Sequence, residues 1–118
     1  MTLVSETFEK TFESAIAVAA NQIFEGNKAK GFWDGERNKL EQQMLIVSEV
    51  AEMTEAVRRK EAIPSPKIPE FTEEEEEAAD VFIRLLDYAG GHSLRLGEAV
   101  LAKLRYNASR PYKHGKAC

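Results

Sequence analysis

The chain has 118 residues, of which 43% are hydrophobic and 31% are charged, and its net charge is −4. These values are typical of one folded domain, so we expect a single domain over residues 1–118. The acidic balance disfavours bulk binding to nucleic acid or to a membrane surface, and no apolar run approaches the roughly 20 residues of a membrane span.

The single cysteine, Cys118, is the last residue of the sequence, so no internal disulfide is expected. Residues 1–13 contain neither a basic start nor an unbroken apolar stretch, and they do not predict a signal peptide. Nothing in the composition indicates an oxidising compartment. We therefore expect a cytoplasmic protein.

A first helix is predicted from about residue 2 to residue 25. Apolar residues recur there at helical spacing, which is typical of a core-facing stripe. The stripe comprises Val4, Phe8, Phe12, Ala15, Ile16, Ala19 and Ile23. Gly26 is expected to end this helix.

The next ten residues, 26–35, form a predicted loop with three glycines and the adjacent aromatics Phe32 and Trp33. Two interpretations stay open. The aromatics plug the end of the helical core, or they offer a flat apolar wall to a planar ligand such as a nucleobase. In the second case Lys28 and Lys30 would lie near the anionic end of that ligand.

A second helix is predicted over residues 36–60, with Asp34 as its N-cap. Glu49 and Glu52 are three residues apart, so they share one face of this helix, at the edge of an apolar face that covers about half of its circumference. The following linker, residues 62–71, contains three prolines. It is expected to be extended and non-helical.

A third helix is predicted to begin at Thr72, because Thr72 and Glu75 have the spacing of a capping box. The run of acids at 73–77 suits the positive end of a helix dipole. Glu77 and Asp80 repeat the i, i+3 spacing and border a second broad apolar arc. Gly90 and Gly91 are expected to end the helix; Arg84 and Asp87 are expected to be ordinary i, i+3 partners.

A fourth helix is predicted over residues 93–109. Lys103, Asn107 and Arg110 form a polar stripe on it, and a basic tail after Pro111 contains His114 and Lys116. The stripe is either a solvated face or a cationic surface for an anionic ligand. It is opposite in sign to the carboxylate pairs.

Four helices without a strand pattern predict an all-α four-helix bundle. The second and third helices are apolar over about 180–200°, whereas a lone antiparallel bundle needs about 100° per helix. The excess predicts association through these helix faces. We expect a homodimer or a homotetramer built as a dimer of dimers.

The two acidic pairs are predicted to face each other and form a four-carboxylate pocket. Such a cluster repels itself unless a cation is bound, and oxygen-only ligands favour Mg²⁺, with Mn²⁺ as the alternative. With an aromatic wall and the cations Lys103, Arg110 and Lys116, the pocket fits a nucleoside triphosphate. Glu49 or Glu52 would serve as general base for a metal-activated water. The GxxxxGK[ST] phosphate loop is absent.

Four ordered segments carry a resemblance to a known family: GFWD, LIVSEVAEMTEA, EEEAADVFIRLLDYA and KLRYNASRPYKHGK. Together they resemble the MazG-like all-α NTP pyrophosphohydrolases, in particular the short, single-domain phage and gene-cassette type. The resemblance implies Mg²⁺-dependent cleavage between the α- and β-phosphates of a nucleoside triphosphate. The products would be a nucleoside monophosphate and diphosphate, in a house-cleaning role on the nucleotide pool.

The resemblance also implies roles for individual residues. The metal-binding ExxE…ExxD pattern is matched by Glu49, Glu52, Glu77 and Asp80. The substrate-contacting elements are matched by Lys103, Asn107, Arg110, His114 and Lys116, and the aromatic near the base site by Trp33. The chain departs from the family pattern in having one domain rather than two, Ser48 in place of a first paired glutamate, and Arg84 where pyrimidine-preferring relatives have an aromatic residue.

Three alternatives accompany this hypothesis. A dUTP- or dCTP-selective enzyme of the same superfamily would use the same acidic pairs. A non-catalytic oligomeric adaptor would use the acids only as a solvated face. A di-iron carboxylate bundle is disfavoured, because neither His92 nor His114 has a glutamate three residues before it.

Overall fold

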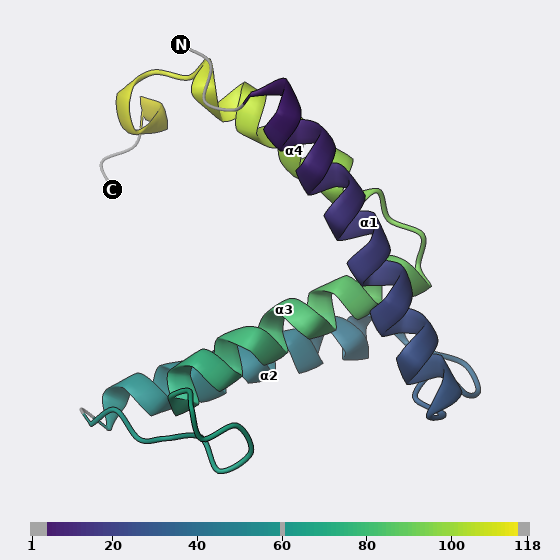
Figure 1. Cartoon of the computed structure of the whole chain (residues 1–118), viewed down its shortest axis with the longest axis vertical. Coiled ribbons are helices and arrows are strands. Elements are labelled where there is room, and N and C mark those ends of the chain that lie inside the picture. The colour runs from purple at the N-terminus through teal and green to yellow at the C-terminus, as the bar shows by residue number, and fades with distance from the viewer. Residues whose placement is uncertain (1–4, 60, 116–118) are drawn as a thin grey trace.

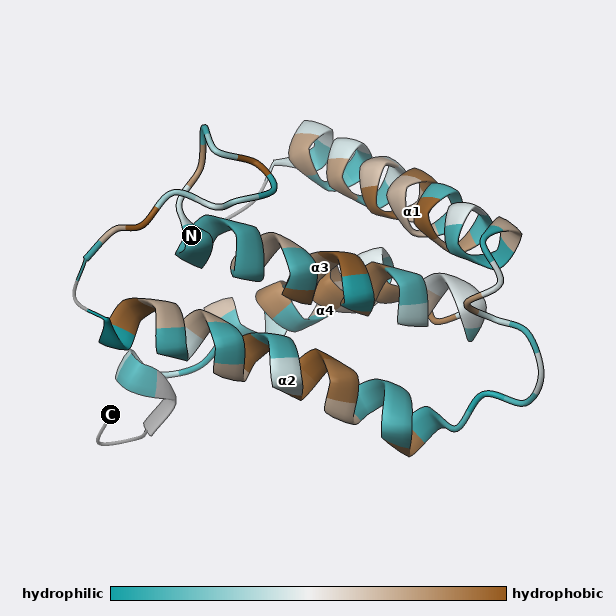
Figure 2. Cartoon of the chain, turned by 90° about the horizontal axis from the view of Figure 1, so that it is seen from below, coloured by the Kyte–Doolittle hydropathy of each residue, from teal (hydrophilic) through white to brown (hydrophobic). Residues whose placement is uncertain are grey.

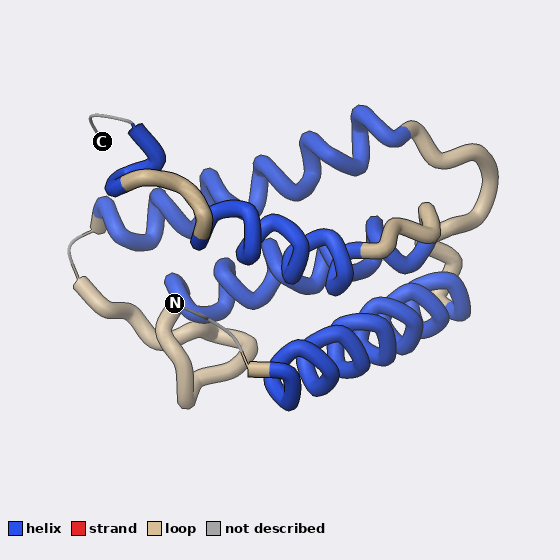
Figure 3. Tube along the Cα trace, turned by 90° about the horizontal axis from the view of Figure 1, so that it is seen from above, coloured by secondary structure: helices blue, strands red, loops and turns tan. Residues whose placement is uncertain are grey.

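The computed structural model describes residues 5–59 and 61–115. It contains four α-helices, which Figure 3 shows joined by loops: α1 (Glu6–Ala29), α2 (Lys39–Arg58), α3 (Glu73–Gly91) and α4 (Leu96–Ala108), followed by the short 3₁₀ helix η1 (Tyr112–Gly115). Within those ranges there is no strand, only an isolated bridge between Pro64 and Thr72. The all-α prediction is confirmed. No described helix is both long and apolar enough to cross a membrane.

The four helices pack in pairs that form two arms. α1 and α4 lie along one arm, α2 and α3 lie along the other, and α3 joins the arms by packing against α1 (Figure 1). The radius of gyration is 17.0 Å, whereas a compact domain of this length is expected to have about 13.5 Å. The chain is therefore more open than a closed bundle of four helices around one core.

Side-chain caps fix where three of the helices begin. Ser5 accepts a hydrogen bond from the backbone N–H of Phe8 at the start of α1. Thr72 and Glu75 form the predicted capping box, with both reciprocal hydrogen bonds present. The predicted start of the second helix is wrong, because Asn38 rather than Asp34 caps α2, accepting from the Glu41 N–H.

The predicted helix end at Gly26 is wrong, whereas the predicted end at Gly90 and Gly91 is confirmed. α1 continues through Gly26 to Ala29, and α3 includes Gly90 and Gly91. A Cβ on Gly90 would lie 2.6 Å from the Ala20 carbonyl oxygen, and one on Gly91 would lie 2.1 Å from the Trp33 ring. Gly90 and Gly91 therefore permit the close approach of α1 and Trp33 to α3.

Replacing Gly90 by alanine is expected to destabilise the fold by about 1–3 kcal/mol, because the new methyl group would force α1 and α3 apart. Gly26→Ala is the matched control, since Gly26 is also helical and has no neighbouring atom within 4 Å of an added Cβ. Gly26→Ala is expected to raise the free energy of unfolding by about 0.4–1 kcal/mol. Urea denaturation followed by circular dichroism measures both; equal effects would contradict the close crossing.

Much apolar surface is left uncovered in a single chain. In the described residues, only Ala20, Leu86, Ala89 and Leu101 are fully buried hydrophobic side chains. Hydrophobic residues, coloured brown, recur along α2 (Figure 2). The exposed apolar side chains of this helix are Leu40, Met44, Val47, Val50 and Val57. A folded monomer of 13.2 kDa should expose about 6,400 Å², whereas this chain exposes 8872 Å².

Candidate metal centre

The acidic pairs of α2 and α3 converge in the arm that these helices form. Carboxylate oxygens of Glu49, Glu52 and Glu77 all lie within 4.8 Å of one another. A second group at the same spacing contains Glu76, Glu77 and Asp80. Glu77 belongs to both groups, so the structure brings together all four residues that the sequence indicated as metal ligands. It adds Glu76, which sequence reasoning assigned to the helix dipole.

Glu49 is the most buried of these acids, with 8% of its surface exposed. Its Oε1 accepts a hydrogen bond of 2.9 Å from Nε of Arg84 on α3. Burial by itself would raise the pKa of Glu49, but hydrogen bonds from Arg84 and from the neighbouring Glu77 and Glu52, with the charge of Arg84, lower the pKa below 4.5. Glu49 is therefore held as a carboxylate.

Glu77 has the opposite environment. Burial, followed by the nearby carboxyl groups of Glu49 and Glu52, raises the pKa of Glu77 to about 7. Its Oε2 is buried and accepts no hydrogen bond from the described residues. A buried oxygen without a partner, beside other carboxylates, is the donor set that suits a hard divalent cation such as Mg²⁺.

Asp80 and Glu76 complete the acidic group beside the linker. Burial and the charges of Glu49 and Glu76 raise the pKa of Asp80, while Lys67 and Arg84 partly offset this. The Ser65 hydroxyl donates to Glu76, and Lys67 Nζ lies 3.8 Å from the other Glu76 oxygen. Glu76 is thus already paired, and it serves to anchor the linker beside the acids.

The proline-containing linker is non-helical as predicted, but it folds back on itself rather than running extended. Ser65 is almost completely buried. Its N–H donates to the Phe71 carbonyl, and its hydroxyl oxygen accepts from the N–H groups of Lys67 and Ile68. These contacts place Lys67 near the acidic group, an arrangement that the proline pattern did not indicate.

A cavity of about 690 Å³ lies beside the acidic group. Three cations, Arg37, Lys67 and Arg84, line it together with five acids: Glu36, Glu41, Glu49, Asp80 and Asp87. The aromatic residue that lines this cavity is Phe32, of which 59% is exposed. A pocket lined by both carboxylates and cations, with an exposed aromatic ring, offers oxygen ligands for a divalent cation and hydrogen-bond donors for an anion bound to that cation.

Trp33 is packed against the helices. Its ring meets the rings of Phe24 and His92 at centroid distances of 5.1 and 5.3 Å. Its Nε1 donates a hydrogen bond of 2.9 Å to Asp87. These contacts fit the interpretation in which the aromatic plugs the end of the core; Trp33 does not line the cavity beside the acids, and its role at a base site stays a prediction.

The polar stripe of the fourth helix lies on the other arm (Figure 1). Lys103 and Arg110 flank the ring of Tyr106, at 4.7 and 5.5 Å from its centroid. Neither they nor Asn107 line the cavity beside the acids. The side chain of His114 and the whole of Lys116 lie outside what the structure describes. Substrate contact by these residues stays a prediction.

Sequence reasoning missed the cations nearest to the acids. Arg84 was expected to pair with Asp87, but it pairs with Glu49, while Asp87 accepts from Trp33. One available signal was its spacing, because Arg84 follows Asp80 by four residues and therefore shares its helix face. Lys67 gave no such signal, since its position depends on how the linker folds.

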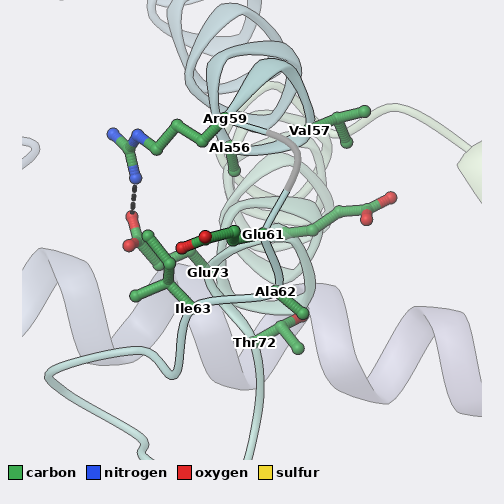
Figure 4. Close-up of a pocket in the computed structure, with 9 residues that line it drawn as sticks. Ala56, Val57, Arg59, Glu61, Ala62, Ile63, Thr72 and Glu73 are labelled. Atoms are coloured by element: carbon green, nitrogen blue, oxygen red, sulfur yellow. Dashed lines mark hydrogen bonds and ion pairs between the residues drawn. The ribbon is translucent and has the colours of Figure 1, made fainter.

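A separate cavity of about 240 Å³ lies where α2 ends and α3 begins (Figure 4). Arg59 reaches across to Glu73, and their ion pair of 2.6 Å ties the two helix ends together. Glu61 points away from this pair (Figure 4). None of the predicted site residues lines this cavity.

Comparisons with protein-family models, with curated proteins and with solved structures found no match to this chain.

The metal-free protein is expected to lose stability through Glu77 as pH rises from about 4.5 to about 7. In this window folded Glu77 keeps a proton that the unfolded side chain has lost, so rising pH favours unfolding. Glu77→Gln should abolish this decrease of the free energy of unfolding with pH. Glu74→Gln, on the exposed side of α3, should keep it. Burial lowers the pKa of His92. His92 therefore makes the free energy of unfolding rise with pH, and it does so equally in wild type, Glu77→Gln and Glu74→Gln.

Urea titrations in EDTA at several pH values measure this difference between Glu77→Gln and wild type. Added Mg²⁺ should then stabilise the wild type at pH 7.5 by binding the folded state, and should stabilise Glu77→Gln less. Parallel pH profiles for wild type and Glu77→Gln would contradict the assigned environment of this carboxyl group.

Proposed function

We propose that this protein is a Mg²⁺-dependent nucleoside triphosphate pyrophosphohydrolase. It would convert a ribo- or deoxyribonucleoside triphosphate and water into the monophosphate and diphosphate. The observation that supports this most is the convergence of Glu49, Glu52 and Glu77 beside a cavity lined by both acids and cations. One oxygen of this group, Glu77 Oε2, is buried and has no hydrogen-bond partner among the described residues. The ordered motifs that resemble the MazG-like family support cleavage between the α- and β-phosphates.

The chain's own residues have separate roles in this proposal. Glu49, Glu52, Glu77 and Asp80 hold Mg²⁺, which when bound supplies Lewis-acid stabilisation and a more acidic water. Glu52 is exposed, whereas Glu49 is held by Arg84. Glu52 is therefore the better placed of the two predicted bases to take a proton from water. Cations in the cavity neutralise the phosphates.

Glu52→Gln is expected to lower kcat by about 100-fold or more, because the amide cannot accept a proton. Glu55→Gln is the matched control on the same helix, since the ion pair of Glu55 within the described residues is an exposed one with Arg58 at 3.8 Å. The assay incubates each protein with a panel of nucleoside triphosphates and Mg²⁺. Phosphorus NMR then identifies diphosphate or orthophosphate, and circular dichroism checks helix content.

Diphosphate release by wild type and by Glu55→Gln, but not by Glu52→Gln, supports the proposal. Orthophosphate as the first product would place the cleavage elsewhere and contradict it. Activity in Glu52→Gln would remove this residue from the catalytic group. The same panel tests the dUTP- or dCTP-selective alternative, because a selective enzyme would hydrolyse one pyrimidine substrate far faster than the others.

The uncovered apolar surface favours one alternative of another class, an oligomeric helical adaptor without catalysis. In that case the acids would be a solvated face. The absence of both turnover and Mg²⁺ binding would support the adaptor over the enzyme.

The same surface supports association of this chain with itself in either case. The excess of accessible area over a typical monomer is about 2,500 Å², which is on the scale that large permanent interfaces bury. The exposed residues of α2 recur at intervals of three, four and seven residues, as a helix-pairing stripe requires. We propose a homodimer, or a tetramer made of two such dimers, in which α2 packs against another copy.

Val47→Glu is expected to shift the protein toward monomer, because it would bury a charge in the α2 interface. Val18→Glu on α1 is the matched control, since Val47 and Val18 are 52% and 53% exposed. Sedimentation velocity at micromolar concentration measures the masses. A monomeric wild type would contradict self-association. If Val18→Glu dissociated the protein as much as Val47→Glu does, the interface would not lie on α2.

A further inference from the structure

Arg84 connects the candidate metal ligands to the cavity beside them. Its Nε donates to Glu49 Oε1 over 2.9 Å, and it also lines the cavity together with Asp80. The side chain of Arg84 is 42% exposed, whereas that of Glu49 is 11% exposed. The guanidinium therefore reaches from a buried carboxylate to the wall of an open space.

This ion pair competes with a metal ion for the same carboxylate. A guanidinium stays charged at any pH at which the protein is folded, so Arg84 cannot lose its proton when a divalent cation approaches. In the described part of the chain, Glu49 is the only carboxylate with which Arg84 forms an ion pair. Asp80, the nearby acid that senses its charge, is itself a candidate metal ligand. The other acids of the cavity are Glu36, Glu41 and Asp87, of which Asp87 already accepts a hydrogen bond from Trp33. An Arg84 released from Glu49 would therefore pair either with one of these acids or with an anion that enters the cavity.

The cavity would supply that anion if a phosphate-containing ligand enters it. A planar guanidinium forms paired hydrogen bonds with phosphate oxygens better than a lysine does. Two further cations line the cavity, but Arg37 stacks on Trp33 at 5.3 Å from the ring centroid and Lys67 lies beside Glu76. Arg84 is the cation of this cavity that is paired directly with Glu49.

We propose that Arg84 is a substrate-binding residue that exchanges one anionic partner for another. It holds Glu49 in the metal-free protein, and it binds a phosphate group of the ligand when Glu49 takes a divalent ion. This inference rests on the proposed function, because it requires both a metal at the acids and a phosphate in the cavity. It makes binding of the two ligands mutually supportive, since each removes an obstacle to the other.

Isothermal titration calorimetry tests this with Mn²⁺ and with imidodiphosphate, a non-hydrolysable diphosphate that has no base. Arg84→Gln removes the charge at similar size, and Arg84→Lys keeps the charge without the planar fork. Arg95→Ala is the control, because Arg95 forms only an exposed pair with Glu98 at 3.9 Å. Circular dichroism and thermal unfolding of each variant show whether the fold is kept.

Arg84→Gln is expected to bind Mn²⁺ more tightly than wild type when no phosphate is present. With Mn²⁺ saturating, the same variant should bind imidodiphosphate about tenfold or more weakly, as for loss of a charge-assisted hydrogen bond. Arg84→Lys should be intermediate in both titrations, and Arg95→Ala should match wild type. Opposite changes in the two affinities are not expected from a residue that only supports the fold.

Two results would overturn the inference and are distinguishable. If wild type binds Mn²⁺ and hydrolyses nucleotides, but Arg84→Gln and Arg84→Lys leave both affinities unchanged or weaken both together, the partner exchange is wrong and the proposed function stands. If wild type binds no Mn²⁺ and hydrolyses no nucleotide, the proposed function fails and this inference fails with it.

Discussion

The repulsion among carboxylates between α2 and α3 is the constraint on which the rest of the site depends. Like charges at this spacing cannot all stay ionised without cations. The metal-free protein responds in two ways, by pairing Glu49 with Arg84 and by raising the pKa of Glu77 to about 7. Packed apolar side chains in the same place would usually be more stable than buried charges. A cluster that costs stability in this way is typical of a functional site.

Close helix crossings determine where the surfaces around this cluster lie. Gly90 lets α1 approach α3, and Gly97 lets α4 approach α1, where an added Cβ would lie 3.3 Å from the Cβ of Ile16. These two contacts fix the two-arm shape, which leaves the outer side of α2 without a partner. The cavity beside the acids is consequently lined by cations of its own arm and its loops, rather than by the stripe of α4.

Features that depend on local spacing were predictable from the sequence, and features that depend on long-range packing were not. Helical periodicity places Glu49 with Glu52 and Glu77 with Asp80, and the capping box at Thr72 is equally local. Gly26 was misread, because a glycine can also lie inside a helix, and spacing did not indicate that Gly90 and Gly91 permit close crossings as well as ending α3. The position of Lys67 likewise depends on how Ser65 folds the linker, which no spacing rule indicates.

The burial of the acids argues against the interpretation in which the acidic pairs of α2 and α3 are only a solvated face. A solvated acidic face keeps its carboxylates hydrated, at little cost in stability and with nearly ordinary pKa values. Here Glu49 is 8% exposed and Glu77 Oε2 is buried without a hydrogen bond from the described residues, so these groups are largely removed from bulk solvent. A divalent cation would remove the repulsion, give the Glu77 oxygen a partner and free Arg84 for an anion. A single bound cation would thus have three separate electrostatic effects on the site, and this is the physical basis of the proposed metal site.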